Sequence, residues 1–311
     1  MTTRDVTAPA LRSERRRTGE ALVKVVLGLA ALVSVLTTVG IVVALVVPSV
    51  QFFEEINVVD YLFGLEWTPL FRDGEFGVVP LLIGTVNVTF WACLVGLPLG
   101  LGTAVYLSEY AAPRMRTTVK PVLEVLAGIP TVVFGYFALT FVTPLVRDLG
   151  IGVGIFNVLA PGLVMGVMLI PTVASLSEDA MSAVPRDLRE GAYALGARRM
   201  AVATKVVVPA ATSGIIASFV LAISRAVGET MIVVIAAGIQ PVDVSWPEIF
   251  DPRVAMETMT GFIAATGAGD VPTGSIEYKT IFAVGLTLFV ITFVMNMISV
   301  RLVRKFREVY E

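Results

Sequence analysis

The chain has 311 residues, of which 56% are hydrophobic and 15% charged, with a formal net charge of -2. Soluble domains carry about 25% charged residues, so this composition, with a mean hydropathy of +0.85, excludes an ordinary soluble protein and indicates an integral membrane protein. The single cysteine, Cys93, excludes a disulfide framework. The absence of histidine removes the commonest general base and metal ligand, so no metal site is expected.

Six apolar runs are long enough to cross a bilayer, which takes about 20 residues of helix. They lie at residues 25–47, 78–107, 121–146, 155–176, 215–239 and 280–300. The predicted fold class is therefore an all-α polytopic membrane protein with six transmembrane helices. The first run is longer than the apolar part of a signal peptide, so we expect a retained helix. In the second run, Gly96 and Gly100 have a spacing that lets membrane helices approach closely.

The basic residues predict the orientation, because loops rich in Lys and Arg stay in the cytoplasm. Eighteen of the 23 Lys and Arg residues lie in the N-terminal tail, the second–third loop, the fourth–fifth loop and the C-terminal tail. Both termini are therefore predicted to lie on the cytoplasmic side of the cell (inner) membrane. Arg15, Arg16 and Arg17 lie beside the first helix, where contact with membrane lipid is expected and binding of nucleic acid is not.

Acidic residues are concentrated on the opposite side, which carries thirteen of the 25 Asp and Glu residues. An acidic outer face repels free anions. If the chain carries an anion, delivery by a docked protein that encloses the anion avoids this repulsion. The alternative is that these acids are only solvated loop residues.

Two opposite charges lie within the fifth run, although a charged side chain near the membrane centre costs roughly 2.5–3.5 kcal/mol. Arg225 and Glu229 are the only ionisable residues between positions 215 and 239. Four positions apart in one helix, they are predicted to project from the same face and to line a pathway. Arginine is always charged and suits an anion. The alternative is a salt bridge that holds helices together and touches no substrate.

Other polar residues in the membrane segments are weaker candidates for the same pathway, because such groups more often form hydrogen bonds between helices. They are Thr230, Ser224, Thr131 and Asn87, with Thr85 and Thr89. Glu109, at the start of a cytoplasmic loop, is expected to be solvated.

The loop at residues 185–211 is predicted to form a short amphipathic helix over Arg186–Leu195, which Gly196 ends. A second short helix is predicted from Arg198 toward Pro209. Such an element suits docking into a groove on a soluble partner. The alternative is an interfacial helix that contacts only lipid headgroups.

This loop resembles the EAA loop of ABC importer permeases, in which Glu-Ala-Ala, a glycine and a final proline have fixed spacing. The residues that carry the resemblance are Glu190, Gly191, Ala192, Gly196 and Pro209. Gly191 stands where the family usually has alanine. The resemblance implies that the loop couples the permease to a separate ATPase subunit. The chain itself lacks the G-x-x-x-x-G-K-[ST] phosphate loop, so we predict no enzyme activity and no cofactor of its own, with ATP and Mg bound by the ATPase.

Nearly the whole chain, from residue 20 to 305, resembles the PstC family of phosphate importer permeases. The stretches that carry this resemblance are residues 62–67, 76–80, 128–135 and 224–231, the last reading SRAVGETM. The resemblance implies a type I (MetI-like) permease core and a role for Arg225 and Glu229 in phosphate passage. It also implies pairing with a PstA-like permease, a PstB-like ATPase dimer and a PstS-like phosphate-binding protein.

These observations predict three segments: residues 1–77 with the N-terminal tail, first helix and an extracytoplasmic segment, a permease core at 78–303, and a cytoplasmic tail at 304–311. The predicted function is half of the translocation pathway of an ATP-driven inorganic phosphate importer. A carboxylate accepts a hydrogen bond from P–OH and repels sulfate, so an Arg–Glu pair suits phosphate. A sulfate or molybdate permease and an ion-coupled stand-alone transporter are the alternatives. A membrane enzyme is disfavoured by the lack of histidine.

Overall fold

A computed structural model of the chain describes residues 18–71, 74–241, 244–245 and 248–305. Over these residues nearly all repeated structure is helical, and the only strand-like feature is an isolated antiparallel bridge between Trp67 and Phe76. The predicted all-α class is confirmed.

Four unbroken helices in the described part of the chain are long and apolar enough to cross a membrane, and two bent helix pairs bring the number to six if each pair is one span. The unbroken helices are α1 (Thr18–Glu55), α3 (Val79–Val105, continued by the π-helical turn η1, Tyr106–Tyr110), α7 (Leu159–Ser182) and α14 (Ile276–Lys305). The first bent pair joins α4 (Pro113–Ala127) to α5 (Thr131–Phe137), η2 (Ala138–Val142) and α6 (Thr143–Asp148). The second joins α9 (Arg199–Val202), η3 (Ala203–Val207) and α10 (Val208–Ala210) to α11 (Thr212–Val227).

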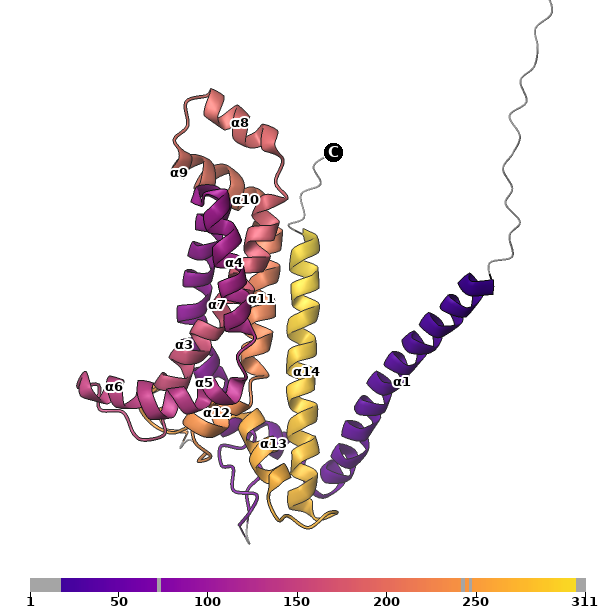
Figure 1. Cartoon of the computed structure of the whole chain (residues 1–311). Helices are drawn as coiled ribbons and strands as arrows, with labels where there is room; N and C mark the ends of the chain where they lie inside the picture. Colours follow the sequence, from indigo (N-terminus) through magenta and orange to yellow (C-terminus); the bar gives the residue numbers. More distant parts are fainter. Residues whose placement is uncertain (1–17, 72–73, 242–243, 246–247, 306–311) are drawn as a thin grey trace, which may run out of the picture. The chain divides into compact units, whose positions relative to one another are not determined.

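The remaining elements are short, and those that Figure 1 labels lie at the two ends of the bundle formed by α3, α7, α11 and α14. They are α2 (Val58–Phe63), α8 (Arg186–Ala194), α12 (Met231–Ala236), η4 (Glu248–Phe250) and α13 (Met259–Ala268). At one end lie α8 and α9, and at the opposite end lie α6, α12 and α13 (Figure 1).

The chain divides into two compact units, residues 1–47 and 48–311. In the first unit, α1 exposes every side chain from Ala21 to Gly40, although nearly all of them are apolar. A helix that is apolar on all sides is stable when lipid or protein surrounds it. The retained first helix expected from its length is therefore suited to span the bilayer.

The most extensive helix contact among the described residues of the second unit is between α3 and α7. A Cβ atom added to Gly96 would lie 2.7 Å from the carbonyl oxygen of Gly166, and one added to Gly100 would lie 2.6 Å from Cβ of Val173. Lipid tails are as apolar as leucine, so membrane helices associate through such close van der Waals contact rather than through escape from water. The close approach predicted at Gly96 and Gly100 is confirmed.

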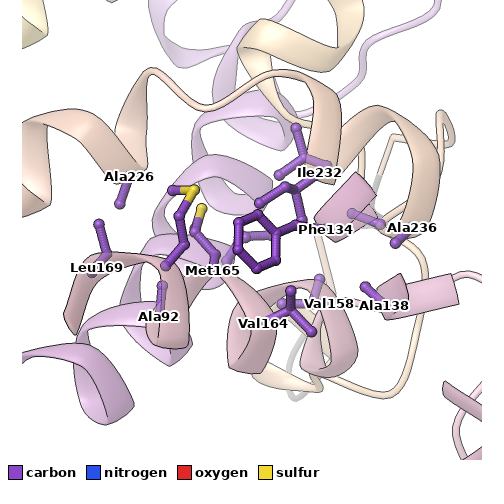
Figure 2. Packing of buried hydrophobic residues seen from close by; sticks show 14 of the residues in the cluster. Ala92, Phe134, Ala138, Val158, Val164, Met165, Leu169, Ala226, Ile232 and Ala236 are labelled. Atoms are coloured by element: carbon purple, nitrogen blue, oxygen red, sulfur yellow. The ribbon is translucent and has the colours of Figure 1, made fainter. Parts of the chain in front are cut away.

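A buried apolar cluster joins five helices around the end of α11 (Figure 2). Ala92 comes from α3, Phe134 from α5, Met165 from α7, Ala226 from α11 and Ile232 from α12. Interiors are packed like organic crystals, so these contacts fix how the short α5 and α12 lie against the long helices.

Two predicted spans are not single helices, so the prediction of one straight helix for each is wrong. The third run bends by 84° between α4 and α5, at Gly128-Ile129-Pro130. Proline lacks the backbone N–H and disfavours helical geometry at the preceding residue, so a break at Pro130 follows. The fifth run, predicted as one helix over residues 215–239, ends at Val227 and resumes at Met231.

Candidate functional site

The break between α11 and α12 contains the two membrane charges singled out in the sequence. Arg225 lies in the last turn of α11, and Glu229 lies in the connection after Gly228. The prediction that both side chains project from one face of one helix is therefore wrong. Glycine is a poor helix former, and the side chain of Glu229 stabilises the start of a new helix, so the backbone stops and restarts here.

Arg225 forms a hydrogen bond with an uncharged side chain. Its Nη1 donates a hydrogen bond to Oγ1 of Thr172 on α7, at 3.2 Å. Among the residues that the structure describes, no carboxylate lies within ion-pair distance of Arg225, and Glu229 is not its partner. The guanidinium is half-buried, and it keeps donors in a planar fork that suits the oxygens of an anion.

Glu229 is buried, with 9% of its surface exposed, and caps α12. Its Oε1 accepts hydrogen bonds from the backbone N–H groups of Met231, at 3.1 Å, and Ile232, at 3.5 Å. A negative charge at a helix N-terminus is favourable because it meets unpaired backbone donors. The carbonyl of Glu229 accepts a hydrogen bond of 2.7 Å from Oγ1 of Thr260 on α13, which fixes the connection from the other side.

The weaker pathway candidates are not all gathered at this break. Ser224 donates to Oδ1 of Asn296 on α14, at 3.2 Å, and Thr230 donates to the carbonyl of Gly228, at 3.4 Å. Thr131 begins α5, which packs against α12. Asn87 is buried elsewhere and donates to the carbonyl of Ile249, at 2.7 Å, so it ties α3 to the short helix η4.

The close packing of α5 on α12 depends on a glycine. A Cβ atom on Gly135 would lie 3.0 Å from the carbonyl oxygen of Met231 and 3.1 Å from Cα of Ile232. The first turn of α12, whose N–H groups Glu229 binds, is thus in direct contact with α5. A larger residue at position 135 would push the two short helices apart.

Thr172 is a contact of Arg225 that the sequence analysis missed. It follows Pro171 inside the apolar helix α7 and looks there like an ordinary membrane threonine. Nothing in the sequence marks a partner 53 positions away. The weak signal is a hydroxyl beside a helix-interior proline, where backbone groups are freed.

The loop predicted to couple to an ATPase forms the short helix α8, with Glu190 and Gly191 exposed and Ala192 half-buried. Gly196 has φ +81°, a left-handed geometry that glycine adopts at little cost. Its N–H donates to the carbonyl of Tyr193, and the N–H of Ala197 donates to that of Ala192, which is the Schellman ending of a helix.

The remaining predicted residues of this loop also have defined places. Pro209 lies in the first turn of α10, just before the 73° bend into α11. A Cβ atom on Gly191 would meet nothing within 4 Å. Leu195, at 91% exposure, is an uncovered apolar side chain beside the helix end. The surface formed by α8 is therefore accessible to a partner.

A buried ion pair attaches α8 to the membrane helices. Nη2 of Arg189 lies 3.1 Å from Oε1 of Glu109, and the same guanidinium donates to the carbonyls of Met181, at 2.7 Å, and Val184, at 2.6 Å. Glu109 belongs to the π-helical turn after α3 and is 7% exposed. The expectation that Glu109 is solvated is wrong, because the fold brings Arg189 against it from 80 positions away.

Comparison with known proteins adds independent findings. The sequence model of the family described as "Binding-protein-dependent transport system inner membrane component" matches residues 96–308. The chain is 34% identical to the probable ABC transporter permease protein YqgH of Bacillus subtilis, over 90% of this chain and 89% of that protein. It is 30% identical to the phosphate transport system permease protein PstC of Xylella fastidiosa, over 78% of this chain and 77% of that protein.

Two solved structures share the fold. A chain of a bacterial alginate ABC transporter, in complex with a periplasmic protein bound to alginate pentasaccharide, matches with a TM-score of 0.63 and 15% identity, over 92% of this chain and 95% of that one. A chain of the MetNI methionine ABC transporter in an inward-facing conformation matches with a TM-score of 0.54 and 19% identity, over 75% of this chain and 95% of that one. At these identities the likeness concerns the fold alone.

Proposed function

We propose that this chain, which belongs to the family of binding-protein-dependent transport system inner membrane components, forms half of the translocation pathway of an ATP-driven inorganic phosphate importer. As a member of that family, it is a multi-pass permease subunit of an ABC transporter in the inner membrane, and it is not an enzyme. The family works with a separate ATPase and a substrate-binding protein. The substrate and the particular partners are the proposed part.

The observation that carries the proposal is that Arg225 contacts a hydroxyl group and no carboxylate among the described residues. Its guanidinium lies at a helix break within an apolar run and contacts the hydroxyl of Thr172. A charge in this setting is costly unless it binds a counter-charge. An oxyanion in transit supplies that counter-charge during each transport cycle. A permanent carboxylate partner would compete with it, and the described residues provide none within reach.

Glu229 supports phosphate over sulfate. Near neutral pH phosphate keeps one or two protons, so a P–OH group can donate to a carboxylate, whereas sulfate has no proton to offer. A fixed negative charge therefore discriminates against sulfate more strongly than against phosphate. Relatives at about 30% identity over most of the chain carry the name phosphate transport system permease protein PstC, which supports the same assignment.

The proposed complex has a PstA-like permease as the second half of the pathway, a PstB-like ATPase dimer that holds ATP and Mg, and a PstS-like phosphate-binding protein. Both termini and α8 lie on the cytoplasmic side, in accord with the placement of Lys and Arg. Closure of the ATPase dimer moves α8, the pathway opens outward, and the docked binding protein releases phosphate toward Arg225 and Glu229. The acidic outer side favours this direct transfer over free diffusion of phosphate.

The test is uptake by the purified complex. The chain is co-purified with its partners and reconstituted into liposomes with ATP inside and the loaded binding protein outside. We expect uptake of phosphate that requires ATP, and little uptake of sulfate or molybdate. Uptake of sulfate or molybdate in preference to phosphate would contradict the substrate. Uptake driven by an ion gradient without ATP would contradict the transporter class.

A further inference from the structure

A cavity of about 430 Å³ lies beside α13, at the end of the molecule opposite α8 (Figure 1). Trp67 and Phe262 supply aromatic walls, and Glu257, Thr266 and Asp270 supply polar side chains. The volume falls in the range of roughly 300–1,000 Å³ that is typical of ligand sites. The placement of Lys and Arg predicts that this end faces outward, so we call it the outer cavity.

Glu257 is a buried carboxyl group that lines the outer cavity. Only 6% of its surface is exposed, and among the described residues its carboxyl takes part in no ion pair or side-chain hydrogen bond. Burial raises its pKa to about 8. A buried carboxylate is costly unless a cation or hydrogen-bond donors accompany it. A cation that enters the outer cavity supplies what this group lacks.

The other lining residues also favour a cation. Asp270 adds a second carboxylate on the exposed side of the cavity, and none of the described lining residues is Lys or Arg. The faces of aromatic rings attract cations, with tryptophan the strongest, and Trp67 and Phe262 lie with ring centroids 4.9 Å apart in this lining. An anion such as phosphate would be repelled here.

The mixed lining fits a basic side chain better than a metal ion. The described residues contain no group of three or more carboxylate or cysteine ligands that could hold a metal. Lysine and arginine carry a charged head on an apolar stem, which matches two carboxylates among apolar walls. Nε1 of Trp67 is buried and has no hydrogen-bond partner among the described residues. A peptide that brings a basic side chain also brings backbone carbonyls, which can accept from this N–H.

The mouth of the outer cavity has the character of a protein-binding surface. Leu70, Phe71 and Ile239 line it and are largely exposed, and exposed apolar patches mark sites of protein contact. The outer side as a whole is acidic, so it attracts a partner with a basic surface. The family works with a soluble protein that delivers the substrate, and that protein reaches this side.

We propose that the outer cavity receives a lysine or arginine side chain of the substrate-binding protein when that protein docks. The basic head pairs with Glu257 and Asp270, and its stem packs on Trp67 and Phe262. This inference rests on the proposed function, and it deepens that function by naming one contact of the docked complex.

The first test measures docking through transport. In the reconstituted complex at pH 8, where Glu257 is partly ionised, we expect Glu257→Gln to raise the concentration of loaded binding protein that gives half-maximal uptake about tenfold, as for loss of one charge-assisted hydrogen bond. Glutamine keeps the size of the side chain and loses the charge. The maximal rate should stay near that of the wild type, because docking precedes transfer.

The matched control is Glu66→Gln. Glu66 is an exposed acid beside Trp67 that does not line the outer cavity, so its loss changes the charge of the chain equally. The half-maximal concentration should change by no more than about twofold, because solvent screens an exposed charge. Equal shifts in both variants, or no shift in Glu257→Gln, would overturn the proposal. Loss of the second permease on co-purification of Glu257→Gln would also overturn it, since the cavity would then hold a permease partner.

A direct probe uses Ala265→Cys, which places a thiol in the cavity lining, with Cys93→Ala, so that one thiol remains in this chain. A cationic methanethiosulfonate should modify this thiol several-fold faster than an anionic one of similar size. Glu257→Gln should reduce this preference, and the loaded binding protein should slow the reaction. An unchanged preference in Glu257→Gln, or no protection by the binding protein, would overturn the proposal.

Arg72 lies outside the described residues, next in sequence to the lining residue Phe71. In Arg72→Gln the preference for the cationic reagent should stay the same. A stronger preference would show that Arg72 itself neutralises Glu257, which would overturn the proposal.

The docking contact and the proposed substrate can fail separately. If the wild-type complex takes up sulfate in preference to phosphate while Glu257→Gln still weakens docking, the substrate is wrong and the docking contact stands. If phosphate uptake requires ATP but the half-maximal concentration is the same in the wild type and Glu257→Gln, the proposed function stands and the docking contact is wrong.

Discussion

Charged side chains near α8 form ion pairs, whereas those at the break between α11 and α12 contact neutral groups. Near α8, Glu109 is paired with Arg189, and Glu178 with Arg116 and Lys120. At the break, Arg225 contacts a hydroxyl and Glu229 binds backbone N–H groups. Paired charges hold segments together, because breaking such a pair leaves an uncompensated buried charge. Charges that bind neutral groups keep their attraction or repulsion for a passing ion.

Helix α7 connects the two regions. Its Thr172 contacts Arg225. The carbonyl of Met181, in its last turn, and the carbonyl of Val184, just after it, accept hydrogen bonds from Arg189. Thr172 and Met181 are nine residues apart, which is about 14 Å along a helix at 1.5 Å per residue. A shift of α8 can therefore reach Arg225 through α7, which is itself packed on α3.

The largest effect is expected from removing the unpaired cation. In Arg225→Gln, phosphate uptake should fall by at least about a hundredfold, because a buried anion would lose its charged, forked partner. Arg225→Lys should also lose most uptake, since it keeps the charge and loses the fork. Both variants are measured in proteoliposomes, and co-purification should show that the complex still assembles. Normal uptake in Arg225→Gln would remove Arg225 from the pathway.

Breaking a paired charge should uncouple the transporter instead. In Arg189→Ala we expect the amount of phosphate imported per ATP hydrolysed to fall about tenfold, as α8 loses its charged attachment to α3 and α7. ATP hydrolysis and uptake are measured in the same vesicles.

The control for Arg189→Ala is Arg253→Gln, which removes an Arg–carboxylate pair of 2.7 Å in the segment between η4 and α13. There Arg253 holds the pKa of Asp251 below its usual value. Uptake per ATP should be unchanged in this control. An equal loss in both variants would show a general effect of lost ion pairs rather than a role of Arg189 in coupling.

Glu229, at the break between α11 and α12, should affect the selectivity for phosphate over sulfate more than the rate of phosphate uptake. Glu229→Gln keeps an amide oxygen that can cap α12 and loses the negative charge. Removing a unit charge a few ångströms from the anion changes its interaction energy by about 1–3 kcal/mol at a partly screened site, so discrimination against sulfate should fall roughly tenfold or more. The measurement is inhibition of phosphate uptake by sulfate preloaded on the inner side. Unchanged inhibition would show that Glu229 serves only as a helix cap.

The smallest effect concerns a buried carboxyl group that keeps its proton in the folded protein. Glu257 lies between α12 and α13 with 6% of its surface exposed, and burial raises its pKa to about 8 from 4.5. Between these pH values the unfolded state releases the proton and the folded state keeps it, so stability falls as pH rises to about 8. The unfolding temperature of the detergent-solubilised complex should fall over this range by roughly 2–6 °C more than that of Glu257→Gln. The same fall in unfolding temperature with pH in the wild-type complex and in Glu257→Gln would contradict this prediction.

Local features of the structure were predictable from the sequence. Helix α8 was predicted over residues 186–195 and ends at Ala194, with Gly196 in left-handed geometry. Amphipathic spacing and a glycine stop act within one helix, so they can be recognised without the rest of the fold. The close approach at Gly96 and Gly100 was predictable for the same reason. The roles assigned to Arg225 and Glu229 in transport stay predictions.

Arg225 and Glu229 were predicted to lie in one helix, but α11 ends between them. Hydropathy averages over a run of residues, and the apolar stretches on either side of Arg225 and Glu229 outweigh the polar residues around Gly228. The break depends on Glu229 binding the N–H groups of Met231 and Ile232, and on Thr260 binding the carbonyl of Glu229. A side-chain cap that competes with the helical backbone is visible only once the partners are in place.

By itself, the sequence determined that the chain is a membrane protein, where its apolar segments lie, and that the loop at residues 185–211 has the pattern of a coupling loop. Those properties depend on the composition and spacing of neighbouring residues. Only the tertiary structure decided which charges are paired: Glu109 with Arg189, Glu178 with Arg116 and Lys120, and Arg225 with the hydroxyl of Thr172. Pairing depends on distances between segments far apart in the chain, and those distances are fixed by how the helices pack.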